Sequence, residues 1–327
     1  MTDPVFHIGG HSPCRTVDPE EPVRVFTEDC FSGRLDSVDG RPREVAPFPQ
    51  VNPMVGPIAV RGVNPGDAVA VHLQRLTPAR DWGVATLSPD FGFLSGTRLS
   101  PNLQPPQAER VWIWRFTEGG AALTTPTQSG PALRVPYRPF HGTLGLAPAH
   151  GEVRLGVGAG EYGGNLDIPE VTAGATLILR AGVAGGHVYI GDGHYSQGDG
   201  EIAGTAIEGA FHTDLVCDRL EAPAGLDWPR LVTRDEIGVI GTGRPLDDAL
   251  RIAASGLIRW VAALCALDLP DAQQLVSQLA RVRVGNVVNS SYSALCALPR
   301  SALAGAADAS ITAHQRLERV AVADAPG

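Results

Sequence analysis

The densest group of residues able to do chemistry lies in one stretch, Gly185–Glu208, which reads GGHVYIGDGHYSQGDGEIAGTAIE. It carries carboxylates and an imidazole close together, among them Asp192, His194 and Glu201. Glycines between them allow positive φ angles and tight bends, so these side chains can converge on one point. Two interpretations follow: a polar hairpin loop after an apolar strand at His187–Ile190, or a metal or general-base site built on that loop. The density of ligand-type residues favours the second.

Other segments could deliver further groups to this site. Asp29 stands at the end of a predicted strand, and His141 lies in an apolar run beside a glycine that leaves room for a ligand. A core histidine satisfied by a backbone carbonyl is an equally weighted interpretation of His141. Asn165 and Asp167 are two residues apart in a second glycine-rich loop, so an extended backbone would point both to the same side.

The composition excludes several mechanisms. The chain has 327 residues and a formal net charge of −9, and all 26 basic residues are arginine. Without a lysine amine, Schiff-base chemistry, a phosphate-binding P-loop and lysine-activated nucleophiles are excluded. The acidic balance without a basic run argues against nucleic acid and anionic membranes as partners. No apolar run reaches the ~18 residues that a membrane span requires.

Five scattered cysteines without a C-x-x-C pattern predict a reducing, cytoplasmic location and no cysteine-based structural zinc. The first residues, MTDPVFHIGG, have neither the basic nor the apolar region of a signal peptide, which supports the same location. Cys30 has no evident partner base in the sequence. Because a free cysteine is more often buried filler, we predict a packing role for it.

The pattern of apolar residues predicts many short strands followed by helices. The chain has 39 glycines and 27 prolines, a content that suits strands joined by turns. Alternating valines at 23–25 and 69–71 indicate two strands, and His72 on the opposite face is predicted to be exposed. Helical periodicity indicates a helix over Leu246–Cys265, and Asp271 begins a second one with a capping-box-like pattern.

These elements predict a β-dominated α+β fold, with a β-sandwich or barrel core and a C-terminal helical part. Strand–helix alternation is missing before residue 245, which argues against a doubly wound α/β fold. Residues 1–218 are the predicted β-rich catalytic part, and residues 219–300 an α+β part of the same domain. Residues 301–327 form an Ala-rich tail with one short helix around Leu303–Leu317.

Six motifs in order give the chain a resemblance to the acetamidase/formamidase family over residues 5–300. They are TEDCFSG (27–33), NPMVGPIAVRGVNPGDAVAV (52–71), PYRPFHGTLGLAP (136–148), GGNLDI (163–168), GDGHYSQGDGEIAGTAIE (191–208) and LDDALRIA (246–253). The family hydrolyses small linear amides, such as formamide and acetamide, to ammonia and a carboxylate. The resemblance therefore implies that this protein hydrolyses small linear amides and that it is a β-rich homo-oligomer. Two departures, His141 for an apolar residue and Asn289 for a frequent aspartate, indicate a shifted substrate.

The resemblance also implies the site residues. The expected metal ligands are Asp29, His141, Asp192 and His194. The expected catalytic residues are Glu201, Asp192, Asn165 and Gln197, and those expected to contact the substrate are Asp167 and Gly164.

Amide hydrolysis needs an activated water, a polarised carbonyl and a proton for the departing amine. A divalent metal, zinc by its mixed N/O ligands or calcium on an oxygen-only subset, can lower the pKa of water from ~15.7 to about 7 and polarise the carbonyl. Glu201 is the expected general base and ammonia-side acid, a role typically worth ~10²–10⁴-fold. Asn165 or Gln197 would hydrogen-bond the amide or the developing oxyanion.

Two other interpretations stay open. The first is metal-free hydrolysis, in which a carboxylate activates water or Cys30 attacks the amide. The second is a non-catalytic β-sandwich that binds a small ligand and holds a structural metal in its acidic loop.

Overall fold

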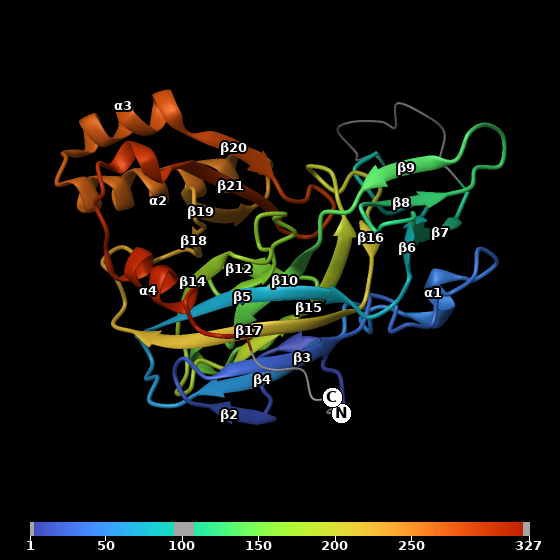
Figure 1. Ribbon diagram of the computed structural model, residues 1–327, viewed down its shortest axis with the longest axis horizontal. Coiled ribbons are helices and arrows are strands. Elements are labelled where there is room, and N and C mark those ends of the chain that lie inside the picture. Colours follow the sequence, from blue (N-terminus) through green and yellow to red (C-terminus); the bar gives the residue numbers. More distant parts are fainter. Residues whose placement is uncertain (1–2, 95–107, 323–327) are drawn as a thin grey trace.

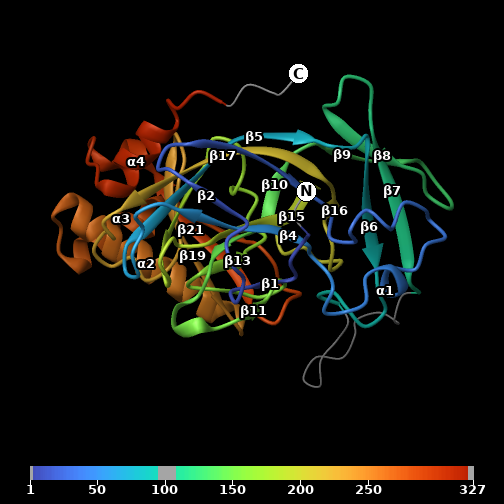
Figure 2. The ribbon, with the colours of Figure 1, turned by 90° about the horizontal axis from the view of Figure 1, so that it is seen from below.

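The computed structural model describes residues 3–94 and 108–322. Two large antiparallel sheets dominate it, and helices gather in the C-terminal part (Figure 1). Figure 2 shows helices α2, α3 and α4 at one end, strands β6–β9 at the other, and β10 and β15 between them. The predicted β-dominated α+β fold with a C-terminal helical part is confirmed.

The larger sheet has eleven strands among the described residues. In spatial order its path is β12 (Ala159–Gly160), β13 (Gly163–Asn165), β10 (Phe140–Leu146), β15 (Val188–Ser196), β16 (Ile207–Glu208), β6 (Trp82–Leu87), β7 (Arg110–Phe116), β8 (Ala122–Thr125) and β9 (Leu133–Pro136). β4 (Met54–Val60) also pairs with β15, and β2 (Arg15–Val17) pairs with β4 in parallel. β15 therefore has three neighbours, β10, β16 and β4, and occupies a central position in this sheet.

The second sheet has eight strands in the described part of the chain, all paired antiparallel. Its order is β20 (Arg281–Val284), β21 (Tyr292–Pro299), β19 (Glu236–Gly243), β18 (Arg230–Val232), β14 (Thr176–Arg180), β5 (Ala68–Pro78), β17 (Phe211–Leu220) and β3 (Pro22–Thr27). β14 and β18 lie on opposite sides of residue 218, yet they pair directly. The two predicted parts, 1–218 and 219–300, therefore share one continuous sheet.

The two large sheets pack face to face over a common apolar core. That core joins Val69 and Leu177 of the eight-stranded sheet to Leu144 and Ile190 of the eleven-stranded sheet. Removing such surface from water stabilises the fold by roughly 25 cal/mol per Å², which fixes the sheets as two layers. The predicted alternation at 23–25 is confirmed, because both valines of β3 are buried and the residues between and beside them are partly exposed.

Short elements complete the connections. A small sheet pairs β1 (His7–Ile8) with β11 (Arg154–Leu155). The short helices are α1 (Pro42–Val45), η1 (Ala149–Gly151) and η2 (Arg300–Leu303).

Helices α2 (Leu246–Cys265) and α3 (Leu269–Leu279) cover β19 and β21, with Leu257 and Trp260 in their shared core. α2 spans the predicted residues. α3 begins earlier than predicted, because Asp268 is the N-cap and its side chain accepts from the Asp271 N–H. Within the described residues no single helix is long and apolar enough to cross a membrane. α2 and α3 pass that test only as a pair, which is bent by 116°.

Helix α4 (Ala309–Leu317) confirms the short helix predicted in the tail, of which residues 323–327 lie outside the described residues. It packs on β5 and β17 and buries His72, which is 2% exposed. The prediction that His72 is exposed is wrong, because α4 covers that face. The Thr176 hydroxyl lies between two imidazoles, 2.8 Å from His72 Nδ1 and 2.9 Å from His314 Nδ1.

Candidate active site

Six titratable side chains meet in the interior, and we call them the acid cluster. They are Cys30, Asp167, Asp192, His194, Glu201 and Glu208, and none is more than 7% exposed. Separate elements supply them. β15 carries the aspartate at 192 and the histidine, and β16 places Glu208 directly opposite that histidine. The turns after β3, β13 and β15 supply the other three.

Asp192 and His194 lie on a strand, whereas the sequence pattern predicted a loop. β15 continues through Ser196, and both side chains lie on the same side of it as the rest of the acid cluster. The alternate glycines serve packing. A Cβ at Gly191 would lie 2.6 Å from the Pro53 carbonyl oxygen, and one at Gly193 would lie 2.3 Å from the Phe211 ring. The prediction that these residues stand on a loop is therefore corrected for Asp192 and His194, which lie on β15, whereas Glu201 lies in the turn that follows it.

Three members of the acid cluster have strained backbones. Asp167, Asp192 and Glu201 have φ angles of 50°, 52° and 50°. A left-handed conformation costs an L-residue roughly 1–2 kcal/mol, and such strain concentrates at functional sites because the surrounding structure must enforce it. The fold thus turns three buried carboxylates toward one another at a cost in stability.

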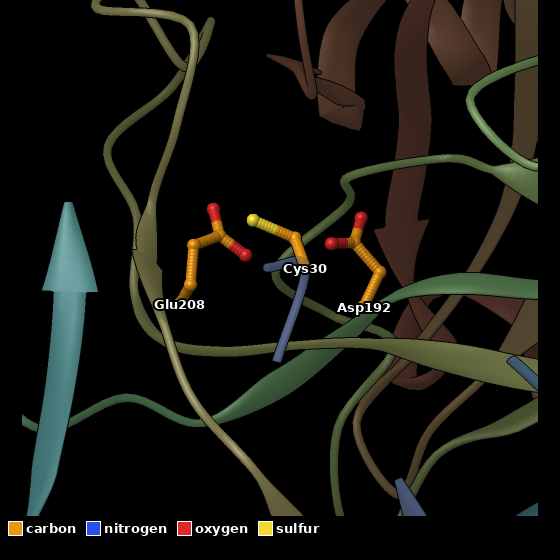
Figure 3. A group of neighbouring side chains, drawn as sticks. All are labelled: Cys30, Asp192 and Glu208. Atoms are coloured by element: carbon orange, nitrogen blue, oxygen red, sulfur yellow. The ribbon is translucent and has the colours of Figure 1, made fainter. Parts of the chain in front are cut away.

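The cluster consists of two adjacent triplets. Asp167, His194 and Glu201 each offer a donor atom, and these atoms lie within 4.8 Å of one another. Cys30, Asp192 and Glu208 do the same (Figure 3).

The imidazole joins the two triplets. Its Nε2 lies 3.4 Å from Asp192 Oδ1 and 3.3 Å from Glu208 Oε2. Both distances are long for hydrogen bonds, so the contact is chiefly electrostatic.

Gly142 of β10 packs directly against the acid cluster. A Cβ there would lie 2.6 Å from Asp167 Oδ1, 2.6 Å from Asp192 Oδ2 and 2.9 Å from His194 Cε1. The sequence indicated that a glycine beside His141 leaves room for a ligand. The structure shows that the two carboxylates and the imidazole take up this room.

Burial and mutual repulsion set the protonation of the cluster. Burial, followed by the charge of Asp192, raises the pKa of Asp167 well above its usual value, and burial followed by Asp167 does the same for Glu201. Burial alone would lower the pKa of His194, but the Glu208 and Asp192 carboxylates raise it well above the ordinary value. The site therefore favours cations and protons.

Amide side chains hold Asp167 in place. Its Oδ2 accepts hydrogen bonds from Asn165 (2.8 Å), Asn286 (3.0 Å) and Asn289 (3.2 Å). Gln197 donates to the backbone carbonyl of Asp167 (3.1 Å) and to that of Gly285 (2.9 Å). The free oxygen of Asp167, Oδ1, therefore points at the rest of the cluster from a fixed position.

The predicted substrate-contacting residues have different surroundings. Both ends of the Asn165 amide are engaged, because its oxygen also accepts from Thr143 (2.6 Å) and Asn52 (3.1 Å). Gln197 keeps a buried Oε1 without a hydrogen-bond partner in the described part of the chain. Gly164 lies in β13, where a Cβ would be 2.4 Å from the Gly158 carbonyl oxygen, so its glycine serves close packing.

The structure places Asp29 and His141 outside the cluster. Asp29 Oδ1 accepts from the Phe31 and Gly33 amides, and its Oδ2 forms a 2.7 Å ion pair with Arg80. The ring nitrogens of His141 contact the Gly191 carbonyl (2.9 Å) and the Thr213 hydroxyl (2.8 Å). Burial lowers the pKa of His141 to about 4. The donor atoms of both residues are already used, so neither is a metal ligand in the arrangement proposed below.

The sequence predicted no role for Glu208. It predicted a packing role for Cys30, with attack on the amide as the open alternative. Glu208 is the last residue of the stretch 185–208, but a lone glutamate on a short strand carries no local signal. The partners of Cys30 stand on β15 and β16, far away in sequence. No spacing rule connects them, because the sheet pairing brings them together.

A cavity of about 530 Å³ lies elsewhere, between β2, β3 and β4. Arg15, Arg24, Glu28 and Met54 are among its lining residues, and none of the six cluster residues lines it. We therefore place the chemistry at the acid cluster and not in this cavity.

The two-sheet fold and the acid cluster define a β-rich protein with a buried group of four carboxylates, one imidazole and one thiol. A sequence model of the Acetamidase/Formamidase family matches residues 10–154 and 151–221. The chain belongs to this family.

Two solved structures share the fold. The acetamidase from Yersinia enterocolitica is 34% identical, with a TM-score of 0.83 over 92% of this chain and 90% of that one. The acetamidase from Bacillus halodurans is 25% identical, with a TM-score of 0.84 over 94% and 98% of the two chains. The similarity to these structures covers more than nine tenths of the chain, and the residues matched by the family model include the six of the acid cluster.

Among curated relatives, the formamidase of Methylophilus methylotrophus is 28% identical over 243 residues, which is 61% of this chain and 59% of that protein. The acetamidase of Mycolicibacterium smegmatis is 26% identical over 265 residues, 63% of this chain and 64% of that protein. The chain thus matches less than two thirds of the length of these relatives.

Proposed function

We propose that the protein hydrolyses a small linear amide, of the formamide or acetamide type, to ammonia and a carboxylate. Membership of the family and the names of its relatives support this activity. The observation that carries the proposal is the acid cluster, which gathers four carboxylates around one imidazole. Such a cluster can activate water and supply a proton to a leaving amine.

We further propose that a divalent metal ion, zinc by its donor set, binds at Asp167 and His194. Asp167 Oδ1 and both ring nitrogens of His194 are buried without a hydrogen-bond partner among the described residues. Unpaired buried groups cost about 1–3 kcal/mol each, so Asp167 Oδ1 and one ring nitrogen fit an ion that would bind them. The ion would take the place of the proton that the carboxylates favour on the imidazole. When bound, the ion would polarise the amide carbonyl and lower the pKa of water.

The protein side chains would divide the remaining work. Glu201 has a carboxylate oxygen within 4.8 Å of the Asp167 and His194 donors, and burial followed by the charge of Asp167 raises its pKa, which favours proton uptake by this carboxylate. It would accept the proton of the attacking water and pass it to the departing nitrogen. Gln197 Oε1, buried without a partner in the described part of the chain, would accept an N–H of the substrate. Asp192 would orient the imidazole through Oδ1.

The test is ammonia release from formamide, acetamide, longer linear amides and a cyclic amide. We expect turnover of the smallest linear amides. The Glu201→Gln variant should lose ~10²–10⁴-fold in kcat, the usual contribution of a general base, while it retains the metal. Full activity in this variant would remove Glu201 from the mechanism. Binding without ammonia release from any amide would favour the binding-module interpretation.

Two further expectations accompany this proposal. Homo-oligomer formation and a cytoplasmic location follow from the family resemblance and the cysteine pattern. Both stay predictions, which light scattering and cell fractionation would test.

A further inference from the structure

We propose that the acid cluster holds a second cation, bound by Cys30, Asp192 and Glu208. This site lies beside the ion proposed at Asp167 and His194, and it rests on the proposed function only for that neighbour. It turns the cluster into a two-metal centre with one sulfur ligand.

The geometry of the triplet supports an ion at its centre. Three separate elements deliver the side chains, and the Cys30 sulfur lies between the two carboxylates (Figure 3). Their donor atoms lie within 4.8 Å of one another. Donors that share one zinc ion, at ~2.3 Å for sulfur and ~2.0–2.2 Å for oxygen, lie within about 4.5 Å of each other, so a small inward movement suffices.

An unsatisfied buried oxygen points to a ligand at this place. Glu208 is 2% exposed, and its Oε2 has no hydrogen-bond partner among the described residues. His194 Nε2 lies 3.3 Å from this oxygen, which is long for a hydrogen bond. A buried acceptor left in this state is costly, and a bound cation would satisfy it.

The charge balance points the same way. Four carboxylates share the cluster with one imidazole, so a full set of charges needs more than one positive group. The Arg80 guanidinium lies nearby but pairs with Glu28 and Asp29. Buried charges persist when they are paired or bind metals. With a Cys30 thiolate the four carboxylates would make five negative charges, and one dication at each triplet would reduce the net charge to about −1.

The sulfur ligand indicates the class of ion. A thiol between two carboxylates is a poor nucleophile by itself, and burial followed by Glu208 and Asp192 raises the pKa of Cys30 well above its usual value. A bound metal deprotonates a coordinating thiol outright. Thiolate with carboxylates suits zinc or a similar late first-row ion, whereas calcium and magnesium prefer oxygen ligands alone.

Cobalt(II) provides a test that needs no substrate. The full-length protein is stripped of metal, titrated with cobalt and examined for bound cobalt per chain and for the near-ultraviolet thiolate-to-cobalt charge-transfer band. We expect two cobalt ions and the band. Cys30→Ser should abolish the band and lower the affinity for the second cobalt ion by about tenfold or more. Even mutation of residues that only hydrogen-bond a metal ligand lowers metal affinity 10–100-fold. Cys14→Ser changes an exposed cysteine and should leave both signals intact.

A second variant protects the test against misfolding of Cys30→Ser. Glu208→Gln keeps the sulfur but removes the charge of one ligand, so it should also lower the affinity for the second cobalt ion. One cobalt per chain in the wild type, no band, or a band that persists in Cys30→Ser would overturn the two-ion site. Two cobalt ions without any ammonia release would instead overturn the proposed function and leave the second site standing.

Discussion

Replacing Gly142 by alanine tests whether the acid cluster is the working centre. Alanine adds one methyl group, and the backbone at this position has no left-handed φ to oppose it. The added Cβ would lie 2.6 Å from Asp167 Oδ1 and from Asp192 Oδ2. Ordinary contacts begin at 3.4 Å, so each carboxylate oxygen must retreat by about 0.8 Å.

The structure opposes this displacement of the Asp167 carboxylate. The other oxygen of Asp167 is held by three amide donors, and its backbone is strained at φ 50°. Misplacement by ~1 Å can cost 10²-fold in rate, and overpacking costs typically 1–3 kcal/mol in stability. We therefore expect Gly142→Ala to lose about 100-fold in kcat/KM while the chain still folds.

The assay is ammonia release, with thermal unfolding to confirm the fold and metal content to report the ligands. Gly198→Ala is the matched control, because a Cβ there meets nothing within 4 Å and the residue lies in the neighbouring loop. Unchanged kcat/KM and metal content in Gly142→Ala would refute the placement of the reaction beside this glycine.

Three further predictions test neighbouring parts of the structure. Asp167→Asn can keep the three hydrogen bonds by placing its amide oxygen at the Oδ2 position, so unfolding temperature should change little while metal binding falls at least tenfold, as isothermal titration would show. Arg80→Ala leaves buried Asp29 unpaired and should destabilise the fold by about 3 kcal/mol in urea, with Arg80→Lys restoring part of it; equal stability of all three proteins would contradict this. Burial lowers the pKa values of His72 and His314 to about 4, so in the folded state both stay neutral while the unfolded chain takes up protons below pH 6.5. Stability should thus fall from pH 6.5 toward 4 by roughly 1.4 kcal/mol per pH unit for each histidine. His72→Leu should reduce this slope, and an unchanged slope would argue against a buried neutral imidazole.

Local patterns predicted the elements well where one side of each was apolar. The valines of β3 alternate with partly exposed residues, and α2 carries an apolar stripe that packs on its sheet. β5 is buried on both faces over its first six residues, so its alternation did not mark an exposed side. The first residues of β15 were predicted as a strand, but its continuation from Gly191 was interpreted as a loop because polar residues and glycines alternate there. That pattern is typical of a turn unless partners elsewhere in the chain satisfy the charges and use the glycines for close packing.

The site was predictable only in part, for the same reason. Asp192, His194 and Glu201 are close in sequence, and Asp167 was expected to contact the substrate. Which groups meet depends on long-range pairing. Glu208 lies beside the imidazole because β16 pairs with β15. Asp29 forms an ion pair with Arg80, which is distant from it in sequence.

The central claim is that the acid cluster activates water for amide cleavage with a bound metal. The most direct measurement is ammonia release from acetamide and formamide by the metal-stripped protein, before and after zinc is restored, with bound zinc measured in the same samples. We predict that turnover is lost on stripping and returns in proportion to the zinc bound. Full turnover by the stripped protein would contradict the claim.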